Sequence, residues 1–178
     1  MSKKRTPTCC LVIDASISEA AGSQELPPPT AGRCRDCLMA VLSVGHRMAW
    51  TPALKAEWDR HQRDFAMQWL VKMLTLGKLR HLNDEPLEEL REAIEAHSDD
   101  SGVKRKMLKD AHLLEAALAT DSRIASLDDN ARGHFQRLAA ALESIRSIMW
   151  VNPAIEDEQA VQWLENGAKR MRSRQLRP

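Results

Sequence analysis

Four acidic residues occupy positions from which their carboxylates could act together. Asp14 and Asp128 each follow a short apolar segment that is typical of a buried strand. Asp110 interrupts an apolar line of residues at helical spacing, where an unpaired carboxylate is costly to bury. Glu57 borders the apolar face of another helical segment. Ligands bind at the carboxyl ends of parallel strands, so we expect these four acids at one edge of a sheet.

A shared acidic pocket of this kind favours a divalent cation. Crowded carboxylates repel one another, and some of them must protonate unless a cation neutralises them. Oxygen ligands suit Mg²⁺ or Mn²⁺ better than zinc. One or two such ions can activate water and stabilise the leaving oxygen in phosphodiester hydrolysis. This chemistry needs no His or Cys nucleophile, and the sequence contains neither a P-loop nor a clear triad.

Each acid also has a purely structural interpretation. Asp14 could cap the turn that follows it, and Asp128 or its neighbour Asp129 could cap the next helix. Asp110 could pair with Lys106 one turn earlier on its helix. Glu57 could simply face solvent. The functional interpretation depends on all four acids meeting at the same edge.

Strand and helix patterns alternate along the chain. Short strands are predicted at residues 9–16, 46–52, 78–82, 123–129 and 147–153. Helices are predicted at residues 34–45, 53–74, 85–97, 103–120, 131–146 and 156–174. Residues 18–33, with three successive prolines, are expected to form a loop, and Thr51 and Ser101 to cap helices. The alternation predicts one three-layer α/β/α domain with a mostly parallel sheet of about five strands.

Length and charge exclude several broad classes. The chain has 178 residues, enough for one domain with a real core, and a net charge of +1, so no global charge draws it to nucleic acid. Residues 1–8 are expected to form a disordered basic tail and residues 9–178 the domain. No apolar run approaches the ~20 residues of a membrane span, and no signal peptide is evident. We therefore expect a cytoplasmic protein without a membrane partner.

The four cysteines form no clear metal site. Cys34 and Cys37 make one CxxC pair, and Cys9 and Cys10 are adjacent. A four-thiolate zinc site needs two well-spaced pairs, and adjacent cysteines rarely chelate together. Reduced, partly buried thiols are therefore expected.

Four stretches of the sequence resemble the signature blocks of PIN-domain ribonucleases of the VapC-toxin-like kind. The resemblance covers residues 10 to about 155, and its blocks are LVIDAS, TPALKAEWDRH, KDAHLLEAALAT and RIASLDDNARGHF. In that family a parallel sheet carries an acidic pocket that binds Mg²⁺ or Mn²⁺ and cuts single-stranded RNA. Many bacterial members are toxins that are inhibited by a small antitoxin protein and are often dimeric. The resemblance therefore implies a ribonuclease, with an antitoxin and a homodimer as candidate partners.

The resemblance also implies roles for individual residues. The catalytic and metal-binding acids of the family fall on Asp14, Glu57, Asp110 and Asp128, and Asp129 could share or take the last role. Two hydroxyl residues fall where supporting groups are expected, Ser16 and Ser126.

Contacts with RNA are expected from basic and aromatic residues. The candidates for holding the RNA backbone are Lys104, Lys109, Arg123 and Arg132. Trp50 and Trp150 lie near predicted strand ends and could stack on bases, although packing in the core is the commoner role of tryptophan.

Other functions fit the sequence less well or remain open. A phosphatase with an aspartyl nucleophile needs a second Asp two residues after the first, where this chain has Ser16. A response-regulator receiver needs a lysine after its fifth strand, and the segment ending at Asn152 offers none. The main alternative is a PIN-like binding or regulatory module without significant nuclease activity.

Overall fold

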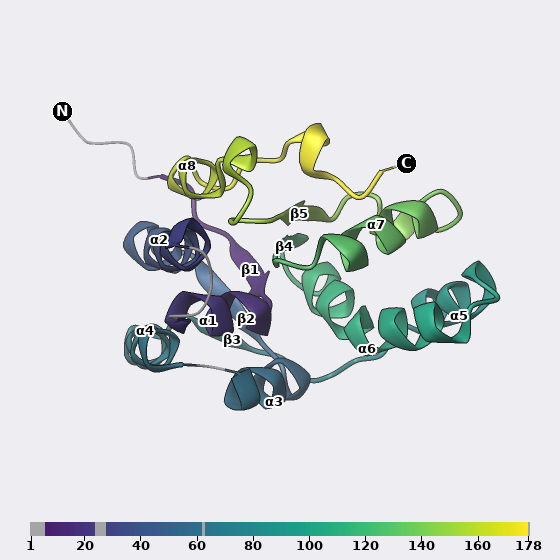
Figure 1. Ribbon diagram of the computed structural model, residues 1–178, viewed down its shortest axis with the longest axis horizontal. Helices are drawn as coiled ribbons and strands as arrows, with labels where there is room; N and C mark the ends of the chain where they lie inside the picture. Colours follow the sequence, from purple (N-terminus) through teal and green to yellow (C-terminus); the bar gives the residue numbers. More distant parts are fainter. Residues whose placement is uncertain (1–5, 24–27, 62, 178) are drawn as a thin grey trace.

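A central sheet of five parallel strands organises the molecule (Figure 1). The computed structural model describes residues 6–23, 28–61 and 63–177. The strands follow the order β3-β2-β1-β4-β5. Their bounds are β1 Cys10–Ile13, β2 Arg47–Trp50, β3 Leu79–His81, β4 Arg123–Ala125 and β5 Met149–Val151. The predicted α/β fold with a parallel sheet is confirmed, and β1 and β4 are neighbours, as the convergence of Asp14 and Asp128 requires.

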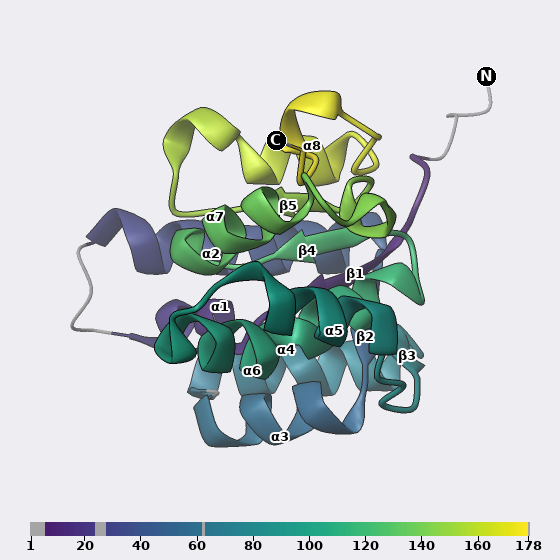
Figure 2. The same cartoon turned by 90° about the vertical axis from the view of Figure 1, so that its right-hand side faces the viewer.

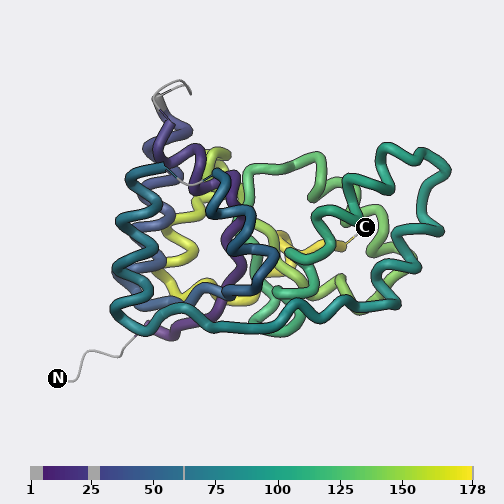
Figure 3. The backbone as a smooth tube through the Cα atoms, turned by 90° about the horizontal axis from the view of Figure 1, so that it is seen from below, coloured from purple at the N-terminus to yellow at the C-terminus, as the bar shows by residue number. Residues whose placement is uncertain are grey.

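Helices cover both faces of this sheet. Their bounds are α1 Ala15–Gly22, α2 Pro28–Val44, α3 Pro52–His61, α4 Asp64–Thr75, α5 Glu88–His97, α6 Ser101–Leu118, α7 Asp129–Leu138 and α8 Ala160–Glu165. Short 3₁₀ helices occupy Glu143–Ile145, Glu156–Glu158 and Arg172–Arg174. Helices α1, α2, α4 and α8 lie on one face, and α5, α6 and α7 lie on the other (Figures 1 and 2). The view from below separates the two helical layers (Figure 3).

The central strand β1 has side chains in both cores, which explains its continuous apolar sequence. Leu11 and Ile13 belong to the core under α1 and α2, whereas Cys10 and Val12 belong to the core under α6 and α7. Successive side chains of a strand point to opposite faces, so a strand covered on both faces needs apolar residues throughout.

Several predicted elements are wrong in extent, among them the helix at residues 131–146, where α7 spans only Asp129–Leu138. Instead of a loop at residues 18–33, α1 extends to Gly22 and α2 begins at Pro28, while residues 24–27 lie outside the described chain. Proline is tolerated in the first turn of a helix, because the N–H it lacks has no partner there. The closing helix is only Ala160–Glu165, because Gly167 and Ala168 have φ angles of 86° and 48°.

The predicted helix at residues 53–74 is divided between α3 and α4. This division lets Trp58 of α3 stack on Trp69 of α4, with ring centroids 5.8 Å apart. The indole of Trp58 donates to the Ile13 carbonyl at 2.9 Å, which fixes α3 beside the end of β1. A periodic pattern cannot reveal the break, because the same apolar residues would also suit one continuous helix.

Helix caps follow the expected chemistry with one change of residue. Leu54 donates its backbone N–H to the Thr51 hydroxyl at 3.2 Å, as predicted for the start of α3. At α6 the cap is Asp100 and not Ser101, because the Asp100 carboxylate accepts from the backbone N–H groups of Gly102 and Val103.

The cysteines and the two strand-end tryptophans lie in the cores. All four cysteines are buried and free, which confirms the expectation of reduced thiols. Trp50 and Trp150 are 8% and 1% exposed, so both are packing residues. No helix in the described part of the chain is both long and apolar enough to cross a membrane. Residues 6–8 of the predicted tail are exposed and outside any helix or strand, and residues 1–5 lie outside the described chain.

Candidate active site

Asp14 is held at the carboxyl end of β1 by two serine hydroxyls. Ser16 and Ser126 donate to the same oxygen, Asp14 Oδ2, at 2.5 Å and 2.7 Å. Each hydroxyl also accepts a backbone N–H from the turn after β4, Leu127 in one case and Asp128 in the other. Asp14 occupies the N-cap position of α1, but its side chain makes no capping hydrogen bond, and its Oδ1 atom accepts no hydrogen bond within the described residues. The two serines fix one oxygen and leave the other available.

Asp128 and Asp129 face different surroundings although they are adjacent. Asp128 caps α7 by accepting the Ala131 N–H at 2.8 Å, and it lines a cavity of about 320 Å³ together with Asp110. Asp129 instead pairs with Arg132 at 2.6 Å and accepts from the Asn152 side chain at 2.9 Å. The geometry therefore brings Asp128, and not Asp129, beside the other acids.

Asp110 is the acid without a partner. Its carboxylate is partly buried on α6 and makes no hydrogen bond or ion pair with any described residue, so the pairing with Lys106 does not form. Burial raises the pKa of Asp110 to about 6, against the opposing charge of Lys109. The charges of Asp128, Asp14 and Glu57 raise the pKa of Asp110 further, so Asp110 lies within the field of the other three predicted acids.

Glu57 reaches the site from α3 and is paired with a histidine that the sequence did not reveal. Its Oε2 atom lies 3.2 Å from Nε2 of His112, and both side chains are nearly buried. Nδ1 of His112 lies 2.9 Å from the Lys109 carbonyl, which can only accept, so Nδ1 carries a proton. The Glu57 carboxylate lies within ion-pair distance of Nε2, although Nε2 makes no hydrogen bond of good geometry with any described residue. The only sequence signal is a polar residue within the apolar stretch 111–118.

The pKa shifts of this pair agree with the geometry. Burial alone would raise the pKa of Glu57, but His112, followed by Lys109 and Arg60, outweighs it and lowers the pKa. Burial alone would lower the pKa of His112, but the Glu57 carboxylate outweighs it and raises the pKa. Glu57 is therefore a carboxylate whose charge is partly neutralised from within the protein.

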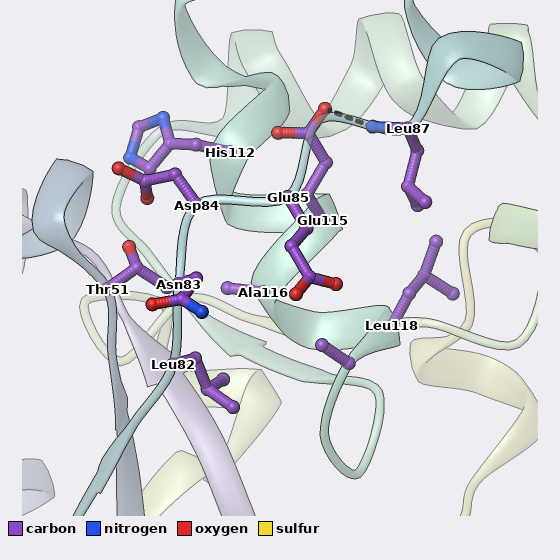
Figure 4. Close-up of a pocket in the computed structure, with 11 residues that line it drawn as sticks. Thr51, Leu82, Asn83, Asp84, Glu85, Leu87, His112, Glu115, Ala116 and Leu118 are labelled. Carbon is purple, nitrogen blue, oxygen red and sulfur yellow. Dashed lines mark hydrogen bonds between the residues drawn. The ribbon is translucent and has the colours of Figure 1, made fainter.

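A second cavity, of about 270 Å³, is lined in part by His112 (Figure 4). Two of its acids already have structural tasks. Glu115 is buried, accepts the Leu87 N–H at 3.0 Å and pairs with Arg91 at 2.8 Å, so it ties α5 to α6. Asp84 accepts the Ala53 N–H at the start of α3. No lysine or arginine of the described chain lines this cavity.

The four basic residues predicted to bind RNA are not brought together. Lys109 lines the cavity of Asp110 and Asp128. Lys104 lies 3.9 Å from Glu95 on the adjacent helix, and Arg132 is held by two acids. Arg123 lies away from the acids, because it begins β4 at the opposite edge of the sheet. There it donates to the Ala168 carbonyl at 2.7 Å.

The acidic groups fit a hydrated hard cation and not a closed metal cage. Within the described residues, no three His, Cys, Asp or Glu side chains form a group that could hold an ion by themselves. Mg²⁺ commonly keeps several water ligands and uses only one or two carboxylates. Asp14 Oδ1 and the unpaired carboxylate of Asp110 are oxygen donors of this kind.

Comparison with known proteins found no match to any protein-family model, curated protein or solved structure. The likeness of the four sequence blocks to PIN-domain ribonucleases therefore remains a resemblance, and the function has to be argued from the site.

Proposed function

We propose that the chain is a Mg²⁺- or Mn²⁺-dependent nuclease that hydrolyses phosphodiester bonds of single-stranded RNA. The observation that carries the proposal is Asp110, a partly buried carboxylate without a partner, in the field of Asp14, Glu57 and Asp128. Leaving a buried charge unpaired costs stability, and such groups cluster at functional sites. The choice of RNA as substrate rests on the resemblance of the four sequence blocks.

Each residue would have a separate task. Asp14 and Asp110 would hold the ion, with Asp128 and Glu57 contributing directly or through water. When bound, a divalent ion would lower the pKa of a water ligand and stabilise negative charge on the phosphate. Ser16 and Ser126 fix Asp14 so that one oxygen stays free, and His112 orients Glu57. The cap interaction with Ala131 fixes Asp128.

A second candidate function is a PIN-like binding or regulatory module, for which α4 provides a specific observation. Met67, Val71 and Leu74 lie at helical spacing on α4 and are 48%, 57% and 59% exposed. An apolar stripe of this kind commonly marks an interaction surface. It suits a small antitoxin protein or a second copy of the chain, and such a partner is compatible with either function.

The test is cleavage of mixed single-stranded RNA and DNA oligonucleotides with Mn²⁺, Mg²⁺ or EDTA. Asp14→Asn and Asp110→Asn should each reduce metal-dependent RNA cleavage at least ~100-fold, because each removes a charged oxygen donor. Asp129→Asn is the matched control, since it removes an adjacent acid that does not line the cavity, and it should retain cleavage. Cleavage that survives both acid substitutions would contradict the proposal. Absence of cleavage with every metal would favour the binding module.

A further inference from the structure

The crevice that contains Asp110 and Asp128 has a second half with basic side chains. Lys106 and Lys109 of α6 and His134 of α7 line the same cavity of about 320 Å³. Helices α6 and α7 lie together on one face of the sheet (Figure 2). Residues of both helices line the cavity. A single crevice thus has acidic and basic side chains next to each other. This arrangement could bind the phosphate backbone of a nucleic-acid strand along the crevice.

The two lysines of this crevice are free to bind an anion. Lys106 and Lys109 are exposed, lie three residues apart and therefore project from neighbouring positions on α6. Neither forms an ion pair with any residue that the structure describes. Lys104 on the same helix differs, because Glu95 lies 3.9 Å away from it. Arg105 is also exposed on α6 but does not line the crevice, so Lys106 and Lys109 are the two cations of this helix that do.

His134 adds a neutral donor to the basic half. The guanidinium of Arg137 lies 2.8 Å from Nδ1 of His134, and a guanidinium can only donate. Nδ1 is therefore the acceptor, and the ring proton lies on Nε2. Burial, together with the charges of Arg137, His97 and Lys106, lowers the pKa of His134, which keeps the ring neutral near pH 7.

The geometry points to a phosphate subsite in this basic half. We propose that Lys106 and Lys109, with His134, bind the phosphate next to the one that is cleaved, so that the single strand runs along the crevice between α6 and α7. This inference rests on the proposed function. Lys106 precedes Asp110 by four residues, about 6 Å along the helix axis, a separation comparable with one nucleotide step. The cavity of Figure 4 lacks lysine and arginine, so it does not compete for the backbone.

The test measures binding without requiring cleavage. The affinity of the whole protein for a short fluorescent single-stranded RNA is measured by anisotropy in EDTA, over a series of salt concentrations. Lys106→Ala should weaken binding about five-fold near 0.1 M salt and reduce the slope of log K against log salt by about 0.7, the value for one lost phosphate contact. Lys72→Ala is the matched control, because Lys72 is exposed on α4 in the opposite helical layer.

The outcomes separate this inference from the proposed function. Equal slopes for Lys106→Ala and Lys72→Ala, or no measurable binding by the parent protein, would overturn the subsite even if Asp110→Asn abolishes cleavage. A lower slope for Lys106→Ala alone supports the subsite even if no metal produces cleavage. A DNA strand of the same sequence should show the same loss, because the contact is to phosphate.

Discussion

Polar residues at the two edges of the sheet differ in whether they are hydrogen-bonded. At the amino edge, His46 accepts the Cys9 N–H at 3.0 Å and donates to the Leu164 carbonyl at 2.9 Å, while Asp121 accepts the Cys10 N–H at 2.7 Å. At the carboxyl edge, Asp110 has no partner among the described residues. Polar groups that complete backbone hydrogen bonds are structural, whereas an unpaired group at a crevice indicates a ligand.

The two buried histidines repeat this contrast. His46 at the amino edge is fully buried, and burial lowers its pKa, so it is a neutral bridge between two backbone groups. His112 at the carboxyl edge faces Glu57, whose carboxylate raises the pKa of His112 against the effect of burial, so this histidine belongs to the acid cluster. The same residue type thus stabilises the fold at one edge and tunes a carboxylate at the other.

The largest expected effect is the loss of the amino-edge bridge. His46→Ala should lower the free energy of unfolding by about 3 kcal/mol, because it leaves the Cys9 N–H and the Leu164 carbonyl unpaired and creates a void. Denaturant unfolding measures this. His81→Ala, at an exposed position on β3, is the control and should change the free energy by less than ~0.5 kcal/mol. Similar losses of unfolding free energy for His46→Ala and His81→Ala would contradict the structural role of His46 at the amino edge.

At the carboxyl edge we expect a substitution to raise, and not to lower, the free energy of unfolding. Asp110→Asn should raise the free energy of unfolding by about 1–2 kcal/mol at pH 7 without metal, because an unpaired charge disappears. The folded pKa of Asp110 is raised to about 6, so the parent loses stability as the pH rises from about 4 through 6. The gain should therefore be small at pH 4 and complete above pH 7.

The control for this prediction is Asp99→Asn, which changes an exposed acid in the turn before α6. It should leave the pH dependence unchanged. Destabilisation by Asp110→Asn at pH 7 would show that the carboxylate has a structural partner after all.

The Glu57–His112 pair should give a smaller effect. Glu57→Gln should lower the pKa of His112, because burial then acts without the opposing carboxylate. The pair should contribute about 1 kcal/mol between pH ~4.5 and pH ~6.5, where both groups are charged. This contribution should be lost as the pH rises through the raised pKa of His112 and as it falls through the lowered pKa of Glu57. NMR titration of the His112 ring measures the shift. An unchanged titration would mean that the two side chains are not paired in solution.

The smallest effect is expected for basic residues outside the crevice. Lys104→Ala and Arg123→Ala should each change the affinity for single-stranded RNA by less than ~2-fold, because one is paired and the other lies at the amino edge. Lys109→Ala should have the larger effect in the same anisotropy assay. Equal losses for all three variants would mean that total charge, and not the crevice, determines binding.

The sequence was sufficient to predict the sheet and the acids at its edge. Buried strands such as β1 appear as short apolar runs, and an acid directly after a strand must lie at the carboxyl edge of a parallel sheet. This reasoning located Asp14 and Asp128 without any knowledge of tertiary contacts. Asp110 was located because a carboxylate on an apolar helix face needs an explanation.

Features that depend on tertiary contacts could not be predicted in this way. The division between α3 and α4 allows Trp58 to stack on Trp69, a contact that periodicity does not reveal. The different surroundings of Asp128 and Asp129 depend on Arg132, one turn further along α7, and on Asn152, which follows β5. Neighbouring residues of the same type give no sequence signal for which one faces the crevice.

The most direct test of the carboxyl edge as a cation site is the melting temperature of the parent protein and of Asp110→Asn, with and without Mn²⁺. A ligand that binds only the folded state stabilises it by about 2.7 kcal/mol at a hundred times its Kd, so the parent should melt several degrees higher with Mn²⁺. Asp110→Asn should melt higher than the parent without metal and should gain little from Mn²⁺. Equal shifts for the two proteins, or no shift for the parent at millimolar Mn²⁺, would contradict the account.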